Sequence, residues 1–223
     1  MKNICNFLEN FLSKNNPELK KDKKEIWIRY IYAYFGFAFI WAFGGHYKPS
    51  VVRFLDNLMR ENFSKCLIPT LDTVYEYYLD EKQAKFIYWK ERISEFQYPL
   101  QASYFQLFVP TIDTERTQDL LKKMTSINRP VFITGGTGTG KSMIVQQFIR
   151  LNRDQMELVP IILNFSAQTT SASTQANIES KLQKKRAKVF AAKGNSKTLI
   201  FIDDVNMPAV EQYGAQPPIE LMR

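Results

Sequence analysis

The chain has 223 residues, of which 45% are hydrophobic and 23% charged, as in an ordinary globular protein of one or two domains. Its formal net charge is +8, but the lysines are spread along the sequence. We expect the two short basic runs, at 20–24 and 184–186, to be solvated helix ends and loops. A single histidine and two distant cysteines exclude a zinc site and a disulfide framework, so a reducing, cytosolic compartment is expected.

The first hundred residues are predicted to be mostly helical. Apolar residues at helical spacing predict helices at 4–12 and 51–59. The uncharged aromatic run at 30–43 predicts a buried helix, because it is shorter than the roughly 20 apolar residues that a membrane span needs. Residues 74–79 favour a strand, and residues 87–96 favour a helix. This region has no recognisable catalytic group, so its aromatic residues are interpreted as packing.

From about residue 105 the pattern changes to alternating strands and helices. A short apolar run at 105–109 precedes a helix that Asp113 or Thr114 is predicted to cap, with its buried side at residues 120, 121, 124 and 127. Strands are predicted at 130–134, 160–165 and 198–202, with helices after residue 140 and around residues 178–182. Strands this apolar are typical of a parallel α/β sheet that is buried on both faces. We therefore expect a mostly helical subdomain over 1–104 and an α/β domain over 105–223.

A glycine-rich loop lies between the first of these strands and its helix. Residues 135–142 spell GGTGTGKS, which matches the phosphate-binding pattern G-x-x-x-x-G-K-[ST]. Small residues let the backbone wrap closely around a phosphate chain, and the helix that follows adds its free amides and positive dipole end. The residues predicted to contact ATP or ADP are Gly135, Gly136, Thr137, Gly138, Thr139, Gly140, Lys141, Ser142 and Met143. Lys141 should reach the β- and γ-phosphates, and the Ser142 hydroxyl should bind Mg²⁺.

The strand at 198–202 ends in an acidic pair. Asp203 is predicted to bind the same Mg²⁺, directly or through a water, opposite Ser142. Asp204 is predicted to occupy the catalytic position in which related hydrolases usually present a glutamate to the attacking water. Aspartate is one methylene shorter, and misplacing a catalytic group by about 1 Å can cost on the order of a hundredfold in rate. The sequence therefore supports ATP binding and leaves rapid hydrolysis open.

The segment before the first helix of this half offers a contact for the base. The backbone groups of Val109 and Thr111 are predicted to face the adenine edge. The alternative is a simple turn that Asp113 caps.

Together these blocks resemble the dynein heavy chain, and in particular the third AAA+ module of its motor ring in the axonemal type. The matching runs are VPTIDT (109–114), GGTGTGKS (135–142), NFSAQTT (164–170), IDDVNMP (202–208) and YGAQPPIEL (213–221). The runs FIWAFGG (39–45) and LDTVYEY (71–77) resemble, more loosely, the helical lid at the end of the preceding module. The resemblance implies a P-loop AAA+ sheet, here C-terminally truncated, with a regulatory nucleotide site.

The same resemblance implies the setting of the protein. The partners would be the remainder of the heavy-chain ring and the dynein intermediate and light chains, with microtubules bound only through parts absent here, in the axoneme of a cilium or flagellum. Neither nucleic acid nor membrane is expected as a partner, and the isolated chain is expected to lack ATPase turnover. Two alternatives stay open: a module whose nucleotide only holds subdomains together, and an unrelated AAA+ protein that acts on nucleic acid, which the net charge suggests.

Overall fold

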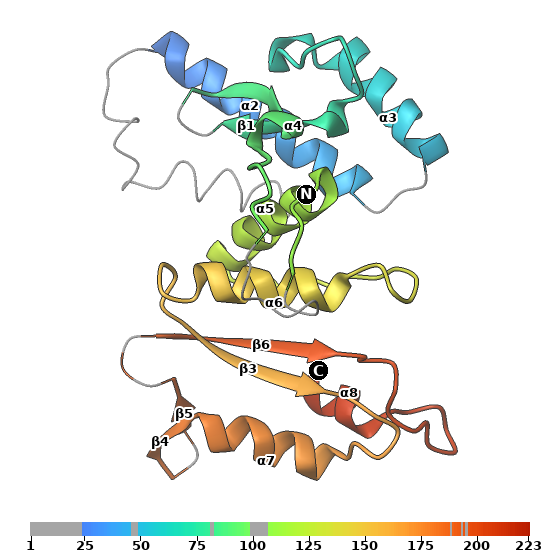
Figure 1. Cartoon of the computed structure of the whole chain (residues 1–223), viewed down its shortest axis with the longest axis vertical. Helices are drawn as coiled ribbons and strands as arrows, with labels where there is room; N and C mark the ends of the chain where they lie inside the picture. Colours follow the sequence, from blue (N-terminus) through green and yellow to red (C-terminus); the bar gives the residue numbers. More distant parts are fainter. Residues whose placement is uncertain are drawn as a thin grey trace. The chain divides into compact units, whose positions relative to one another are not determined.

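The computed structural model describes residues 24–45, 49–80, 83–98, 107–187, 189–192, 194 and 196–223 (Figure 1). Contacts between residues divide the chain into two compact units, Met1–Val131 and Phe132–Arg223. The predicted helix at 4–12 lies outside the described residues, as do residues 105 and 106 of the predicted apolar run. The sequence boundary expected at 104/105 stays a prediction.

The first unit is built around α2 (Lys24–Gly44), which confirms the predicted aromatic helix. It is followed by α3 (Pro49–Asn62), the short 3-10 turns η2 (Ser64–Cys66) and η3 (Val74–Glu76), strands β1 (Tyr77–Asp80) and β2 (Lys85–Tyr88), and helices α4 (Trp89–Arg92) and α5 (Ile112–Ser126). The buried residues of α2 pack against the two strands in one core, which consists of Tyr30, Ala33, Tyr34, Phe37, Tyr77, Leu79, Ala84 and Phe86. In the described part of the chain, no helix has the length and apolar character needed to cross a bilayer.

The antiparallel pair β1–β2 corrects the prediction for residues 87–96. These residues were expected to form a helix, but residues 85–88 form a strand and only Trp89–Arg92 is helical. The reason is a cross-strand pair: the ring centroids of Tyr77 and Tyr88 are 4.4 Å apart, and the Tyr77 hydroxyl donates to the Tyr88 hydroxyl at 2.9 Å. Such aromatic pairs stabilise strands, and they outweigh a local helical pattern. The strand favoured at 74–79 starts only at Tyr77, after a 3-10 turn.

The second unit is an α/β sandwich. It contains α6 (Lys141–Asn152), β3 (Leu158–Asn164), α7 (Ser171–Lys181), β4 (Gln183–Arg186), β5 (Val189–Ala191), β6 (Lys197–Asp203) and α8 (Pro217–Met222). Strands β3 and β6 pair in parallel from Leu158↔Lys197 to Asn164↔Asp203, which confirms the predicted parallel sheet. Figure 1 shows α6 and α7 on opposite sides of this pair. The core on the α7 side consists of Ile161, Leu163 and Phe165, with Ile178, Leu182, Ile202 and Val205 packed against them.

Three predictions for this half were wrong. Residues 130–134 form no strand, and Phe132 is 76% exposed, because a strand needs a ladder partner and no described strand pairs with this segment. The prediction that the sheet is buried on both faces is wrong as well, since Ile162 of β3 and Ile200 of β6 are 48% and 38% exposed. The basic run at 184–186 is solvated as expected, but it lies in β4, which pairs antiparallel with β5.

Candidate functional site

The glycine loop requires glycine at two of its positions. Gly138 and Gly140 have φ values of 78° and 79°, in the left-handed region that residues with a Cβ rarely adopt. Gly140 is also the N-cap of α6. The turn of the loop therefore ends directly at the first turn of α6.

Lys141, Ser142 and Met143 form the first turn of α6. Their amides precede the first helical hydrogen bond, in which the Ile144 amide donates to the Gly140 carbonyl at 3.0 Å. Amides at a helix start have no partner within the helix and, together with the helix dipole, attract anions. The helix is anchored by the burial of Val145, Phe148, Ile149 and Asn152. This confirms the predicted helix and gives its start the character of a phosphate site.

The side chain of Lys141 folds back over the loop. Its Nζ donates to the carbonyl oxygens of Gly135 at 3.1 Å and Gly136 at 2.6 Å. The Thr139 hydroxyl also donates to the Gly136 carbonyl, at 2.9 Å. The ammonium group is thus held at the loop by solvent-exposed hydrogen bonds, which phosphate oxygens can replace at little cost.

The acidic pair lies at the carboxyl end of β6. Asp203 is the last residue of the strand, is half-buried, and accepts the Asp204 amide through Oδ1 at 3.1 Å. Asp204 is exposed and has a φ of 52°, a left-handed conformation that aspartate tolerates better than most residues. Its carbonyl accepts the Met207 amide at 2.9 Å, so the chain turns sharply after the strand.

Two polar residues beside the acidic pair were not among the predicted site residues. Asn164, the last residue of β3, pairs in register with Asp203, so an amide and a carboxylate end neighbouring parallel strands. Gln216 donates through Nε2 to the carbonyls of Asn206 at 3.2 Å and Pro208 at 2.6 Å. The position of Asn164 at a strand end was a usable signal in the sequence. The hydrogen bonds from Gln216 could not be predicted in this way, because they join two separate sequence runs, 202–208 and 213–221.

The predicted base-contacting residues, Val109 and Thr111, belong to the first unit. Thr111, rather than Asp113 or Thr114, is the N-cap of α5, in a reciprocal capping box with Thr114. The Thr111 amide donates to Thr114 Oγ1 at 2.7 Å, and the Thr111 carbonyl accepts the Glu115 amide at 3.0 Å. The helix cap therefore already uses the backbone groups of Thr111. A contact from Val109 and Thr111 to adenine stays a prediction.

Magnesium matches the chemistry of the predicted donors. The Ser142 hydroxyl and the Asp203 carboxylate are hard oxygen ligands, and Mg²⁺ is usually bound through one or two carboxylates together with substrate phosphates. Among the described residues, no group of three or more His, Cys, Asp and Glu side chains is placed to hold a metal ion. A site with one carboxylate and one hydroxyl needs no such group. That the two oxygens share one ion stays a prediction.

Comparison with known proteins adds independent findings. A family model described as "P-loop containing dynein motor region" matches residues 96–223, and one described as "Dynein heavy chain AAA lid domain" matches residues 1–91. The chain is 37% identical over 192 residues to dynein axonemal heavy chain 6 of Homo sapiens, and 35% identical over 192 residues to the dynein-1-beta heavy chain, flagellar inner arm I1 complex, of Chlamydomonas reinhardtii. Each alignment covers 85% of this chain, but only 5% and 4% of the relative. An alignment to the dynein beta chain, flagellar outer arm, of the same alga covers 99% of this chain and 5% of that protein, at 32% identity.

Proposed function

Because the chain belongs to the dynein heavy chain family, we propose that it is an ATP-binding segment of a dynein motor ring, with residues 105–223 forming the N-terminal part of the third AAA+ module. Residues 1–104 would then be the end of the second module. The observation that carries the proposal is the glycine loop, with two left-handed glycines and Lys141 at the start of α6. Membership of the ring is inferred from the family, and nucleotide binding is inferred from the glycine loop.

In this proposal different residues of the second unit bind the phosphates, the Mg²⁺ ion and the water. The amides of the first turn of α6 and the ammonium of Lys141 neutralise the phosphates, which carry several negative charges. The Ser142 hydroxyl and the Asp203 carboxylate hold Mg²⁺, which when bound offsets further phosphate charge. Asp204 orients a water, from a position one methylene further away than a glutamate would allow. Tight binding with slow turnover fits a regulatory nucleotide site rather than the main motor site.

The cellular setting is inferred from the relatives, which are named as axonemal or flagellar dynein chains. We propose that the segment acts in microtubule-based movement of a cilium or flagellum, in the axoneme. Its direct partners would be the rest of the heavy-chain ring and the intermediate and light chains. The chain spans about 5% of the length of these relatives. We propose that microtubules are bound only through other parts of the protein.

The test of nucleotide binding is Lys141→Ala in the 223-residue chain. Removing the ammonium takes away a charge-assisted contact to phosphate, and we expect affinity for a fluorescent ATP analogue to fall by at least about tenfold. Helix content measured by circular dichroism should not change, because the Lys141 contacts are exposed. Lys184→Ala, in the exposed strand β4, is the matched control and should leave affinity unchanged. Equal affinity of the Lys141→Ala and native chains would refute the assignment.

A second candidate, a module whose nucleotide only holds subdomains together, is favoured by the short side chain of Asp204. Asp204→Glu in a full-length ring separates the two. A marked gain in turnover would mean that the native aspartate prevents hydrolysis and favours the structural role. Unchanged or reduced turnover, measured by phosphate release, would favour a site that already hydrolyses at its own rate.

A further inference from the structure

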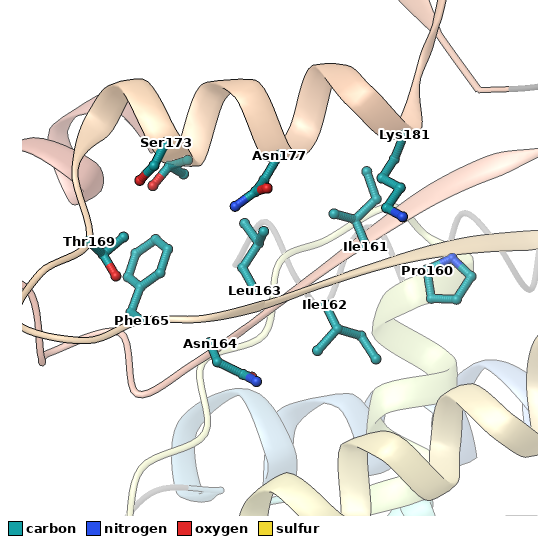
Figure 2. Close-up of a pocket in the computed structure, with 11 residues that line it drawn as sticks. Pro160, Ile161, Ile162, Leu163, Asn164, Phe165, Thr169, Ser173, Asn177 and Lys181 are labelled. Carbon is teal, nitrogen blue, oxygen red and sulfur yellow. The ribbon is translucent and has the colours of Figure 1, made fainter.

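A groove in the second unit lies apart from the glycine loop, between α7 and strand β3. Its volume is about 440 Å³. The residues that line it include Ile161 and Leu163 of β3, Phe165 directly after this strand, and Ser173, Asn177 and Lys181 of α7. Figure 2 shows Asn177 and Lys181 extending from the helix toward the strand, while Ile161 and Leu163 point up toward the helix. The groove therefore combines an apolar floor with a polar wall.

The groove follows an unpaired edge of β3. Among the described strands, β3 pairs only with β6. The backbone N–H and C=O groups of odd-numbered residues along this strand point to β6. At its two ends the Glu157 carbonyl accepts the Lys197 amide at 2.9 Å, and the Phe165 amide donates to the Asp203 carbonyl at 3.0 Å. Because backbone groups alternate along a strand, those of Pro160, Ile162 and Asn164 point to the open edge. Pro160, which lacks an N–H, stands where no bond to β6 is lost, as is usual for an edge strand.

The charge around the groove is positive. Lys181 lies in its wall and is exposed, and none of the described residues that line the groove is acidic. The chain continues directly from α7 into β4, whose Lys184, Lys185 and Arg186 are all exposed. None of these four cations forms an ion pair with a described residue. A lysine beside an open strand edge, on a helix that leads directly into a basic strand, favours a partner with negative side chains.

We propose that the groove is a docking site for an extended acidic peptide segment of a partner protein, which adds to β3 as a further strand. The amide of Ile162 and the backbone groups of Asn164 would bind the peptide backbone, as in other cases of strand addition. Side chains on one face of the peptide enter the groove beside Asn177 and Lys181. Those on its other face cover Ile162, which is 48% exposed. The segment therefore alternates acidic and apolar residues.

The proposal does not depend on nucleotide binding. It uses none of residues 135–142 and neither residue of the acidic pair, so Lys141→Ala should leave peptide binding unchanged. Peptide binding and nucleotide binding can thus fail separately.

The probe is a fluorescein-labelled peptide of about ten residues that alternates glutamate and valine, titrated into the 223-residue chain by fluorescence anisotropy. A peptide with lysine in place of glutamate tests the charge. A peptide with alternate backbone amides N-methylated tests the strand pairing, because it cannot donate on one edge. We expect the first peptide to bind and both others to bind at least about tenfold more weakly. Slower hydrogen exchange at Ile162 and Asn164 should accompany binding.

Two variants place the peptide in the groove. Asn177→Trp should fill it and Lys181→Glu should reverse its charge, and each should weaken binding by about tenfold or more. The matched controls are Ala176→Trp, an exposed residue of α7 outside the groove lining, and Arg150→Glu, an exposed residue of α6. Both controls should bind within about twofold of the native chain.

Three outcomes would overturn the proposal. The first is no binding of the alternating acidic peptide. The second is equal binding of the N-methylated peptide or of an oligothymidylate with the same number of negative charges, which would mean general attraction of polyanions to the basic strand. The third is equal loss of binding in the control and groove variants.

Discussion

Asp119 is the residue whose substitution should destabilise the first unit most clearly. Its side chain is only 5% exposed, and its two oxygens accept from Arg92 Nη1 and Lys123 Nζ, each at 2.7 Å. Arg92 also packs over the rings of Tyr78 and Trp89, with its guanidinium carbon 5.3 Å and 5.8 Å from their centroids. One buried carboxylate therefore joins α5 to α4. Asp119→Ala removes the charge that both cations share.

The expected loss can be worked from the exposure of the partners. Removing one partner of a fully buried ion pair costs about 3–5 kcal/mol, because the other charge is left without compensation. The Lys123 side chain is 13% exposed and that of Arg92 is 36% exposed, so water screens part of the penalty. We expect Asp119→Ala to lower the free energy of unfolding of the first unit by about 2–3 kcal/mol. With a urea dependence of about 2 kcal/mol per molar, the midpoint shifts by roughly 1 M or more.

Tryptophan fluorescence measures this unit alone, because Trp27, Trp41 and Trp89 all lie before residue 132. The matched control is Asp113→Ala in the same helix, whose side chain is 87% exposed and lies 3.6 Å from Arg116. An exposed pair of this kind should contribute less than about 0.5 kcal/mol. If the two variants unfold at the same urea concentration, the ion cluster does not stabilise the packing of α5 and the reasoning is wrong.

Two further predictions concern the core of the first unit. Gly44→Ala places a Cβ only 1.5 Å from the Tyr75 hydroxyl oxygen, so the tyrosine must move, and we expect a loss of about 2 kcal/mol in the same urea assay; an unchanged midpoint would show that the tyrosine relaxes freely. Burial raises the pKa of the Cys66 thiol from 9.0 to about 11. The unfolded thiol ionises first as pH rises, so the stability that Cys66 contributes is full below pH 9 and is lost between pH 9 and about 11. Urea midpoints over this range should fall less in Cys66→Ala than in the native chain, and parallel curves would contradict the assignment.

The glycine loop and its helix were predictable from local sequence. A phosphate site made from backbone amides needs glycines at left-handed positions and a helix start directly after them, and all of these lie within a few residues of one another. The aromatic helix α2 was predictable for a similar reason, since its length and uncharged character lie within one segment. The presence of β3 and β6 also followed from their apolar runs, although β3 (Leu158–Asn164) starts two residues before and ends one residue before the predicted 160–165, and β6 (Lys197–Asp203) extends one residue beyond each end of the predicted 198–202. In each case the determining interactions lie close together in the chain.

The features that sequence patterns missed depend on contacts between distant residues. Residues 85–88 became a strand because Tyr88 packs against Tyr77, and residues 130–134 formed none because no described strand pairs with them. The burial of Leu121 in α5 was predicted from the helical spacing of apolar residues. The burial of Asp119 was not, because it depends on ion pairs with Arg92 and Lys123.

The sequence by itself therefore determined where phosphate can bind, because the glycines, the lysine and the helix start are adjacent in the chain. Only the tertiary structure decided which charged residue is buried, which strand edge stays open and which carbonyls Gln216 binds. Pairing and burial are set by partners far along the chain, and the free energy of a strand or a buried charge depends on those partners.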